Sequence, residues 1–235
     1  LAELGGNGDG DGDTPVPPDA PAPADSPPRY VITGGVDGDP HLRAFDLDYD
    51  LHLAGEFVLV RDPVDGFEIQ ARFEPTADEN ATLTTAIAAN VLGTEVMLTS
   101  SRVVVDGEEA NGRVRLATGA TVTPTADEGV VIDWPDGTRV QFDNQFVRLQ
   151  LPPHRAGRLV GLLGNADGDP GNDFVLRDGT VLSEPTELEI HRRFGESWRL
   201  ADDESLFTYD AGKSTATFTL PHVPLRLASE VVADL

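Results

Sequence analysis

The sequence of 235 residues contains no cysteine, a single lysine and few basic residues of any kind. Without cysteine the chain cannot form disulfides, use thiolate catalysis or build cysteine-ligated zinc or iron–sulfur sites. With 17 Lys and Arg against 41 Asp and Glu, its formal net charge is −24. It therefore lacks the basic surface that nucleic-acid phosphates require, and an anionic membrane surface would repel it. A cation that prefers oxygen ligands is the first partner to expect.

Long hydrophobic runs are also missing. No apolar segment approaches the roughly 18 residues of a membrane-spanning helix, so no membrane insertion is expected. The chain starts at Leu1 without a visible signal peptide, and we therefore expect a piece of a longer protein. The single lysine, Lys213, indicates a GC-rich, bacterial genome, and a secreted bacterial module can use a metal ion where an animal module uses disulfides.

Composition divides the chain into three parts. Residues 1–28 hold seven prolines, five glycines, six acidic residues and no basic one, which predicts a disordered acidic linker with too little apolar surface to fold. Within it, Asn7–Asp13 imitates the start of an EF-hand, but the twelfth position is Pro18 instead of Glu, so a solvated spacer is preferred. Residues 29–200 have the pattern of a folded domain. Residues 201–235 form a strand-like tail, which either docks on a sheet edge or begins the next module.

Short strands follow one another through the folded part. The alternation of apolar and polar residues in Phe67–Phe73 is typical of a half-buried antiparallel strand. Asp106-Gly107 and Pro135-Asp136-Gly137 mark tight turns between such strands. The regular spacing predicts an all-β fold, an antiparallel β-sandwich or a barrel-like pair of sheets. The strands expected are residues 55–60, 67–73, 94–98, 101–105, 130–134, 138–142, 146–151, 158–163 and, in the tail, 214–220.

One short helix is expected near the end of the folded part. Thr186 and Glu189 have the spacing of a capping box, in which each side chain accepts the backbone N–H of the other residue. Gly195 can end this helix. Trp198 would then anchor it to the sheet.

The densest group of possible metal ligands lies in the segment Gly161–Phe174. Its five oxygen-bearing side chains are Asn165, Asp167, Asp169, Asn172 and Asp173. Glycines between them permit a tight loop that turns successive oxygens toward one point. Ca²⁺ requires such a supply, because it takes six to eight oxygens at roughly 2.3–2.6 Å. The alternative is a polar turn without an ion, which is disfavoured because clustered aspartates would repel one another.

Three stretches resemble the von Willebrand factor type D domain family. Gly38-Asp39-Pro40-His41, followed by Phe45-Asp46, resembles the family's opening, although such residues also make ordinary turns. The segment Gly161–Phe174 resembles the family's Gly-Leu-Cys-Gly-Asn-x-Asp-Gly motif, with Leu163 in place of cysteine. Phe194–Trp198 is similar to its closing Phe-Gly-x-Ser-Trp. Order and spacing agree over residues 29–200. Because cysteine is absent, the family's disulfide-linked multimers are not implied.

The resemblance implies a calcium-binding, non-enzymatic module of a larger secreted or cell-surface protein, with a role in adhesion or assembly. Its partners would be Ca²⁺ and other extracellular proteins or neighbouring domains. The equivalent loop in the family binds one Ca²⁺. Carried over residue by residue, Asn165, Asp167, Asn172 and Asp173 would give side-chain oxygens and Asp169 its backbone carbonyl. The resemblance adds a carboxylate from Asp46, which local spacing could not supply.

A second function stays open. Some family members with the Gly-Asp-Pro-His sequence (the GDPH motif) cleave themselves between Asp and Pro in mild acid, so the resemblance implies autoproteolysis through Asp39, Pro40 and His41. The Asp39 carboxyl can attack its own main-chain carbonyl and close an anhydride, while His41 protonates the leaving Pro40 nitrogen. Water would then complete cleavage, or an amine or hydroxyl on a partner would give a crosslink.

Conventional enzyme chemistry finds little support in the sequence. Gly195-Glu-Ser-Trp-Arg199 starts like a nucleophile elbow but has Arg where the second Gly belongs. The five histidines contain no pair at positions i and i+4, which argues against a helical zinc site.

Overall fold

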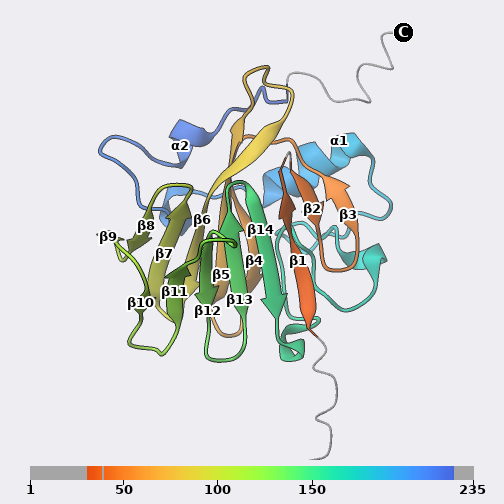
Figure 1. Cartoon of the computed structure of the whole chain (residues 1–235). Helices are drawn as coiled ribbons and strands as arrows, with labels where there is room; N and C mark the ends of the chain where they lie inside the picture. Colours follow the sequence, from red (N-terminus) through yellow and green to blue (C-terminus); the bar gives the residue numbers. More distant parts are fainter. Residues whose placement is uncertain (1–30, 39, 225–235) are drawn as a thin grey trace, which may run out of the picture.

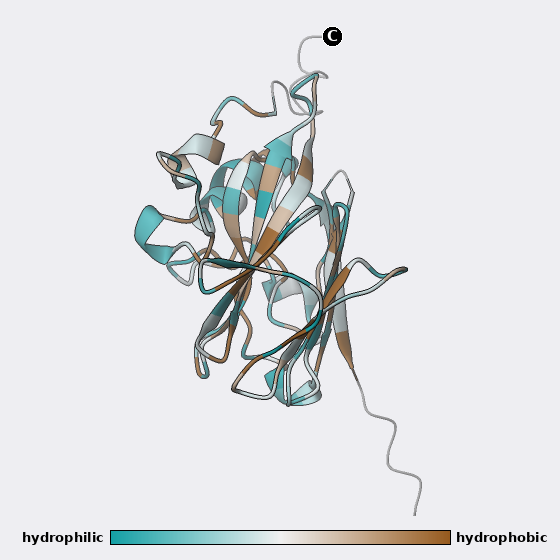
Figure 2. Ribbon diagram, turned by 60° about the vertical axis from the view of Figure 1, so that its left-hand side comes forward, coloured by the Kyte–Doolittle hydropathy of each residue, from teal (hydrophilic) through white to brown (hydrophobic). Residues whose placement is uncertain are grey.

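A computed structural model describes residues 31–38 and 40–224 of the chain. Two layers of antiparallel β-sheet pack face to face, seen from the front in Figure 1 and from the side in Figure 2. The predicted all-β antiparallel sandwich is thereby confirmed. The linker predicted at residues 1–28, including the EF-hand-like Asn7–Asp13, lies outside the described residues, and so does Asp39.

The first sheet has eight strands in the order β10-β11-β12-β13-β14-β1-β2-β3. The inner strand β1 pairs with β2 on one side and with β14, which comes much later in the chain, on the other (Figure 1). Its strands are β1 (Ile32–Asp37), β2 (His41–Arg43), β3 (Asp48–Asp50), β10 (Val114–Arg115), β11 (Thr121–Pro124), β12 (Val130–Asp133), β13 (Arg139–Asp143) and β14 (Phe146–Leu151).

The second sheet has six strands that follow the chain order from β4 to β9. They are β4 (Gly55–Asp62), β5 (Phe67–Pro75), β6 (Thr82–Val91), β7 (Thr94–Thr99), β8 (Val103–Val105) and β9 (Glu108–Ala110). Side chains from both sheets fill the space between the layers. Phe57 stacks on Phe73 at 5.5 Å between ring centroids, and Phe67 of β5 meets the edge of Trp134 from the other sheet at 5.8 Å. Burial of this apolar surface is the main force that stabilises the fold.

A buried arginine joins the two sheets at one end. Arg155, in the 3₁₀ helix Pro153–Arg155, is 3% exposed and its guanidinium lies over the Phe67 ring at 4.3 Å. Its nitrogens lie 3.2 Å from Asp62, 3.0 Å from Asp65 and 2.9 Å from Asp136. The first two carboxylates belong to the β4–β5 hairpin and the third to the β12–β13 turn, so one side chain connects a hairpin of each sheet.

The predicted capping box is confirmed. Thr186 Oγ1 accepts the Glu189 N–H, and the Glu189 carboxylate accepts the Thr186 N–H. Helix α1 (Glu187–Glu189) then continues as a π-helix, Ile190–Gly195. Gly195 does not end this helix as expected, because Glu196 and Ser197 remain helical. Its absence of a side chain has another use, since a Cβ there would come within 2.7 Å of Leu53. The glycine thus lets the helix pack directly against the segment between β3 and β4. Trp198 anchors the end, as predicted, because its carbonyl accepts the Val58 N–H of β4 at 3.0 Å.

Two predicted strands are wrong. Residues 158–163 run beside β4 and pair with it at Arg61 and Val160 (2.8 and 2.9 Å), but Gly161 at φ +125° interrupts the extended backbone. In the tail, Thr215–Phe218 form helix α2, because Ser214 Oγ accepts the Ala216 N–H and starts a turn. The alternation in residues 214–220 therefore does not correspond to a strand.

The described part of the tail, residues 201–224, packs on the six-stranded sheet. It includes the 3₁₀ helix Asp202–Glu204 and α2. The Arg72 guanidinium of β5 lies 3.7 Å from the Phe218 ring centroid and 4.5 Å from that of Phe207. Beneath these rings Arg72 forms a 2.7 Å ion pair with the buried Glu56 of β4. The tail thus covers a charged pair on the outer face of the sheet.

Candidate metal centre

The glycine-rich segment is held against β4 by backbone hydrogen bonds. Leu163 N–H donates to Leu59 O at 3.0 Å, and Leu163 O accepts the Phe45 N–H at 3.0 Å. Gly161 is required here, since a Cβ would lie 2.8 Å from Leu59 O. These bonds bring Asp46, which follows Phe45 between β2 and β3, to the loop that begins at Gly164.

Asp46 and the loop meet directly. The Gly168 N–H donates to Asp46 Oδ2 at 3.1 Å, although 122 positions separate the two residues in sequence. The structure therefore brings Asp46 to the segment with which the family resemblance had grouped it.

Asp167 lies at the centre of the loop's side-chain contacts. Its Oδ2 accepts hydrogen bonds from the amide nitrogens of Asn172 (2.9 Å) and Asn165 (3.2 Å), and its Oδ1 accepts the Asp169 N–H (2.8 Å). The bond from Asn172 is the largest cause that lowers the pKa of Asp167. Asn165 Nδ2 also donates to Asn172 Oδ1 at 2.6 Å. Three of the predicted ligands thus form one contiguous cluster.

Asp173 is the buried member of this cluster, with a side chain only 4% exposed. Its Oδ1 accepts the Asn165 N–H at 3.0 Å, whereas its Oδ2 has no hydrogen-bond partner among the described residues. Burial raises the pKa of Asp173 to about 6, and the charges of Asp46, Asp167 and Asp169 add to this effect. An oxygen in this position fits a cation, because nothing else in the described structure compensates its desolvation.

Asp169 is more exposed and uses its oxygens within the loop. Its Oδ1 accepts the Gly171 N–H at 2.9 Å, and its carbonyl accepts the Asn172 N–H at 3.3 Å. Both bonds stabilise the 3₁₀ turn Pro170–Asn172, which places Asn172 and Asp173 opposite Asn165.

The donor chemistry of this group limits how a cation could be held. Among the described residues, no three carboxylate, imidazole or thiol side chains converge so as to form a metal site by themselves. A cation held here would also need the amide oxygens of Asn165 and Asn172, and a half-turn of each amide would exchange its nitrogen for its oxygen. Mixed carboxylate, amide and carbonyl oxygens suit Ca²⁺ among the common ions.

Tyr49 is a neighbour of the site that the motifs did not reveal. Its hydroxyl donates to Leu162 O at 2.6 Å, and its ring meets Phe174 and Phe194 edge-on at 5.2 and 5.9 Å. Burial, followed by the charge of Asp173, raises its pKa well above the ordinary value. No pattern in the sequence around Tyr49 indicates contact with this distant loop, and the strand that holds it, β3, was not predicted.

Pro40 and His41 lie at the start of the β2–β3 hairpin, where His41 is the first residue of β2. Pro40 is buried and its carbonyl accepts the Leu51 N–H at 3.1 Å. His41 Nδ1 contacts Asp50 Oδ1 across the hairpin, and both side chains are more than half exposed. Asp39 itself lies outside the described residues, so the predicted reacting group is not placed.

Comparison with known proteins decides the family. The family model of the von Willebrand factor type D domain matches residues 34–180. The chain belongs to the von Willebrand factor type D domain family. The predicted membership is confirmed, and this type D domain departs from the family pattern in having no cysteine.

Several animal proteins are similar to this type D domain. Rat SCO-spondin is 34% identical over 175 residues, which are 70% of the chain and 3% of SCO-spondin. Mouse mucin-2 is 29% identical over 180 residues, 72% of the chain and 4% of mucin-2. Human sushi domain-containing protein 2 is 28% identical over 208 residues, 79% of the chain and 25% of that protein. The chain thus spans a small part of each relative.

These relatives bear on two further expectations. Membership in this family makes the type D domain an extracellular structural module, and the predicted extracellular location is thereby confirmed. The bacterial origin expected from the single lysine receives no support, because these relatives are animal proteins. In the described part of the chain, no helix has both the length and the apolar character to cross a membrane.

Proposed function

We propose that this type D domain is a calcium-stabilised module that serves adhesion or assembly in a larger extracellular protein. The observation that carries the proposal is the buried Asp173 Oδ2, which has no hydrogen-bond donor among the described residues, while burial and the charges of Asp46, Asp167 and Asp169 oppose ionisation of Asp173 and raise its pKa. A bound Ca²⁺ would supply the positive charge that offsets this repulsion.

The residues that would hold the ion come from two distant parts of the chain. Asp46 extends from the loop between β2 and β3, while Asn165, Asp167, Asn172 and Asp173 belong to the glycine-rich loop, with Asp169 shaping its turn. Drawing their oxygens together would fix this loop against both sheets, since Phe45 and Leu163 already join the two segments at 3.0 Å. In a chain without disulfides, such a link would stabilise the surface that contacts neighbouring domains or partners.

The test compares variants of equal charge change. Asp167→Ala and Asp173→Ala should each remove most of the rise in melting temperature that Ca²⁺ produces. Asp178→Ala is the matched control, because Asp178 also accepts a backbone N–H in a tight turn (Thr180, 2.9 Å) but lies outside the cluster. Asp9→Ala and Asp11→Ala in the acidic segment should behave like this control. Equal losses in all five variants would indicate diffuse counter-ion binding and contradict the site.

A second candidate function is autoproteolysis at Asp39–Pro40, and the contact between His41 and Asp50 favours it. Asp50 orients the His41 ring beside Pro40, whose carbonyl is fixed by Leu51. In this reaction an Asp39 carboxyl oxygen bonds to the Asp39 carbonyl carbon, the C–N bond breaks, and the Pro40 nitrogen takes the proton that His41 donates. Water then opens the anhydride.

Intact mass tests this second function. During incubation near pH 5.5, the chain of 25.1 kDa should give one fragment that ends at Asp39 and another that begins at Pro40. Asp39→Ala should prevent cleavage and His41→Ala should slow it. A chain that keeps its full mass with and without Ca²⁺ would exclude autoproteolysis and leave the structural function untouched.

A further inference from the structure

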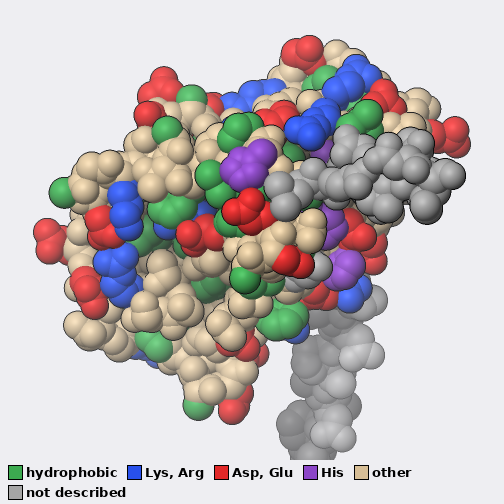
Figure 3. Space-filling model, turned by 90° about the horizontal axis from the view of Figure 1, so that it is seen from above, with side chains coloured by type: hydrophobic (Ala, Val, Ile, Leu, Met, Phe, Trp, Pro, Cys, Tyr) green, Lys and Arg blue, Asp and Glu red, His purple; other side chains and the backbone are tan. Residues whose placement is uncertain are grey.

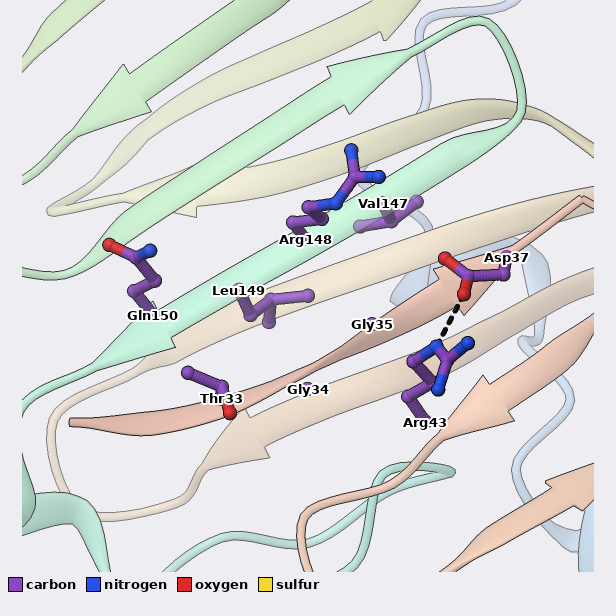
Figure 4. Close-up of a pocket in the computed structure, with 9 residues that line it drawn as sticks. All are labelled: Thr33, Gly34, Gly35, Asp37, Arg43, Val147, Arg148, Leu149 and Gln150. Carbon is purple, nitrogen blue, oxygen red and sulfur yellow. Dashed lines mark hydrogen bonds and ion pairs between the residues drawn. The ribbon is translucent and has the colours of Figure 1, made fainter. Parts of the chain in front are cut away.

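The outer face of the eight-stranded sheet carries a hollow of about 400 Å³ above β1 (Figure 4). Among the residues that line it is Gly35, which pairs with Arg148 of β14 on one side and with Arg43 of β2 on the other. Since glycine has no side chain, the row Arg148–Gly35–Arg43 leaves a gap between two guanidinium groups. None of the residues that line this hollow belongs to the candidate metal centre.

The pairing of β1 with β14 leaves no room for a side chain at position 35. A Cβ at position 35 would lie 2.0 Å from Val147 O, which is backbone and cannot move aside as a side chain could. The close approach of β1 and β14 therefore requires glycine here. The backbone at Gly35 is consequently a fixed part of the hollow, while the side chains of Arg43, Arg148 and Gln150 form its rim.

The two arginines differ in their partners. Arg43 is held by Asp37, as Figure 4 marks, and lies 3.7 Å from Asp48. Arg148 has no carboxylate partner among the described residues, and its guanidinium lies 5.8 Å from the centroid of the Phe146 ring, which is 39% exposed. Arg148 thus presents an uncompensated positive charge and unused N–H donors at the edge of the hollow.

The surroundings limit what kind of ligand fits. β1 is paired on both sides, so a peptide cannot add to it as a further strand. Recognition must come from side chains: the Arg148 guanidinium for an anion, and the exposed Thr33 hydroxyl and Gln150 amide for neutral polar groups. The exposed Phe146 ring, which does not line the hollow but neighbours Arg148, offers an apolar face beside it. A ligand with several negative charges is disfavoured by the net charge of −24.

We propose that this hollow binds an acidic saccharide, with Arg148 holding a single sugar carboxylate. A saccharide matches these side chains because it combines hydroxyl groups for Thr33 and Gln150 with C–H faces for the neighbouring Phe146 ring. Guanidinium and carboxylate are complementary in both charge and geometry, since two parallel N–H groups meet two oxygens. This binding is independent of the calcium site.

Titration of the whole chain with sialyllactose, which carries one carboxylate, tests the proposal. Followed by amide NMR at low salt, sialyllactose should shift the Gly34 and Gly35 signals, whereas neutral lactose should bind much more weakly. Arg148→Gln should weaken binding by roughly tenfold or more, as expected for loss of a charge-assisted hydrogen bond. Thr33→Val should weaken it less and leave the charge unchanged.

Arg115→Gln is the matched control. Arg115 lies on β10 of the same sheet and also lacks a carboxylate partner among the described residues, but it is outside the hollow. Its substitution should leave sialyllactose binding unchanged. Equal losses for Arg115→Gln and Arg148→Gln, equal binding of lactose, or unchanged Gly34 and Gly35 signals at saturating probe would each overturn the proposal.

Discussion

Gly164 controls how closely Asp173 approaches the loop. Its φ is +78°, and a Cβ there would lie 2.3 Å from Asp173 Oδ1. Gly164→Ala adds backbone strain and a steric clash, which should lower the free energy of unfolding by about 2–5 kcal/mol and weaken the calcium response. Urea unfolding with and without Ca²⁺ measures both effects.

Gly168→Ala is the control for this prediction. Gly168 has a similar φ of +89°, but nothing lies within 4 Å of the position that its Cβ would take. Only the backbone strain applies there, about 1–2 kcal/mol. Losses of the same size in the two variants would show that contact with Asp173 is unimportant.

At the scale of elements, Arg155 is expected to stabilise the junction of the two sheets. Arg155→Leu would leave the fully buried Asp62 with only Arg158, at 2.7 Å, as a charged partner. Removing one member of a buried ionic network typically lowers stability by about 3–5 kcal/mol. Arg139→Leu is the control, because Arg139 also pairs with two carboxylates but is about one-third exposed. This substitution should lower the free energy of unfolding by at most about 1 kcal/mol. Equal losses in urea unfolding would contradict this role for Arg155.

The same junction predicts a pH dependence. Although burial acts in the opposite direction, hydrogen bonds from backbone N–H groups and from Arg155 lower the pKa of both Asp65 and Asp136. A carboxylate whose pKa is lower in the folded than in the unfolded state stabilises the fold at pH values above its unfolded pKa, near 3.9. This contribution disappears as the pH falls through the pKa of the folded state. The difference in unfolding free energy between wild type and Arg155→Leu should therefore shrink below about pH 4. If urea unfolding shows that the difference in free energy between the two proteins stays constant or grows from pH 6 to pH 3, this prediction is contradicted.

Several elements were readable from the sequence because local chemistry determines them. The capping box at Thr186 and the hairpin at Asp106-Gly107 depend on residues a few positions apart. β6 was missed, because its run of Ala and Thr lacks a clear period, and its pairing with β5 and β7 is a tertiary effect. The strand predicted in the tail was wrong for the opposite reason. Local capping by Ser214 starts helix α2 there, although apolar and polar residues alternate.

The candidate site was predictable only in part. Asn165 to Asp173 are close in sequence, so composition alone grouped them. Asp46 came from family resemblance, and the Gly168–Asp46 contact depends on how β2 and β4 place two distant loops. Neither Tyr49 nor Arg148 could be found in advance, because their neighbours come from distant parts of the chain.

At the scale of the whole molecule, the net charge of −24 should make stability depend on salt. Acidic side chains are distributed over the face of the molecule seen in Figure 3. Repulsion among carboxylates destabilises the compact state, and added ions screen it. In chelator, raising NaCl from about 0.02 to 0.5 M, where the Debye length falls to a few ångströms, should raise the melting temperature. A melting temperature that falls or stays constant would mean that ion pairs outweigh the repulsion.

The most direct measurement of the central claim is thermal unfolding in millimolar Ca²⁺ and in chelator, at equal ionic strength so that screening is the same. Ca²⁺ at a hundredfold excess over its Kd should add about 2.7 kcal/mol, which for a domain of this size raises the melting temperature by roughly 5–10 °C. Mg²⁺ at the same concentration should have a much smaller effect, because it demands a tighter octahedral shell. Identical melting in Ca²⁺ and chelator would contradict a calcium-stabilised module.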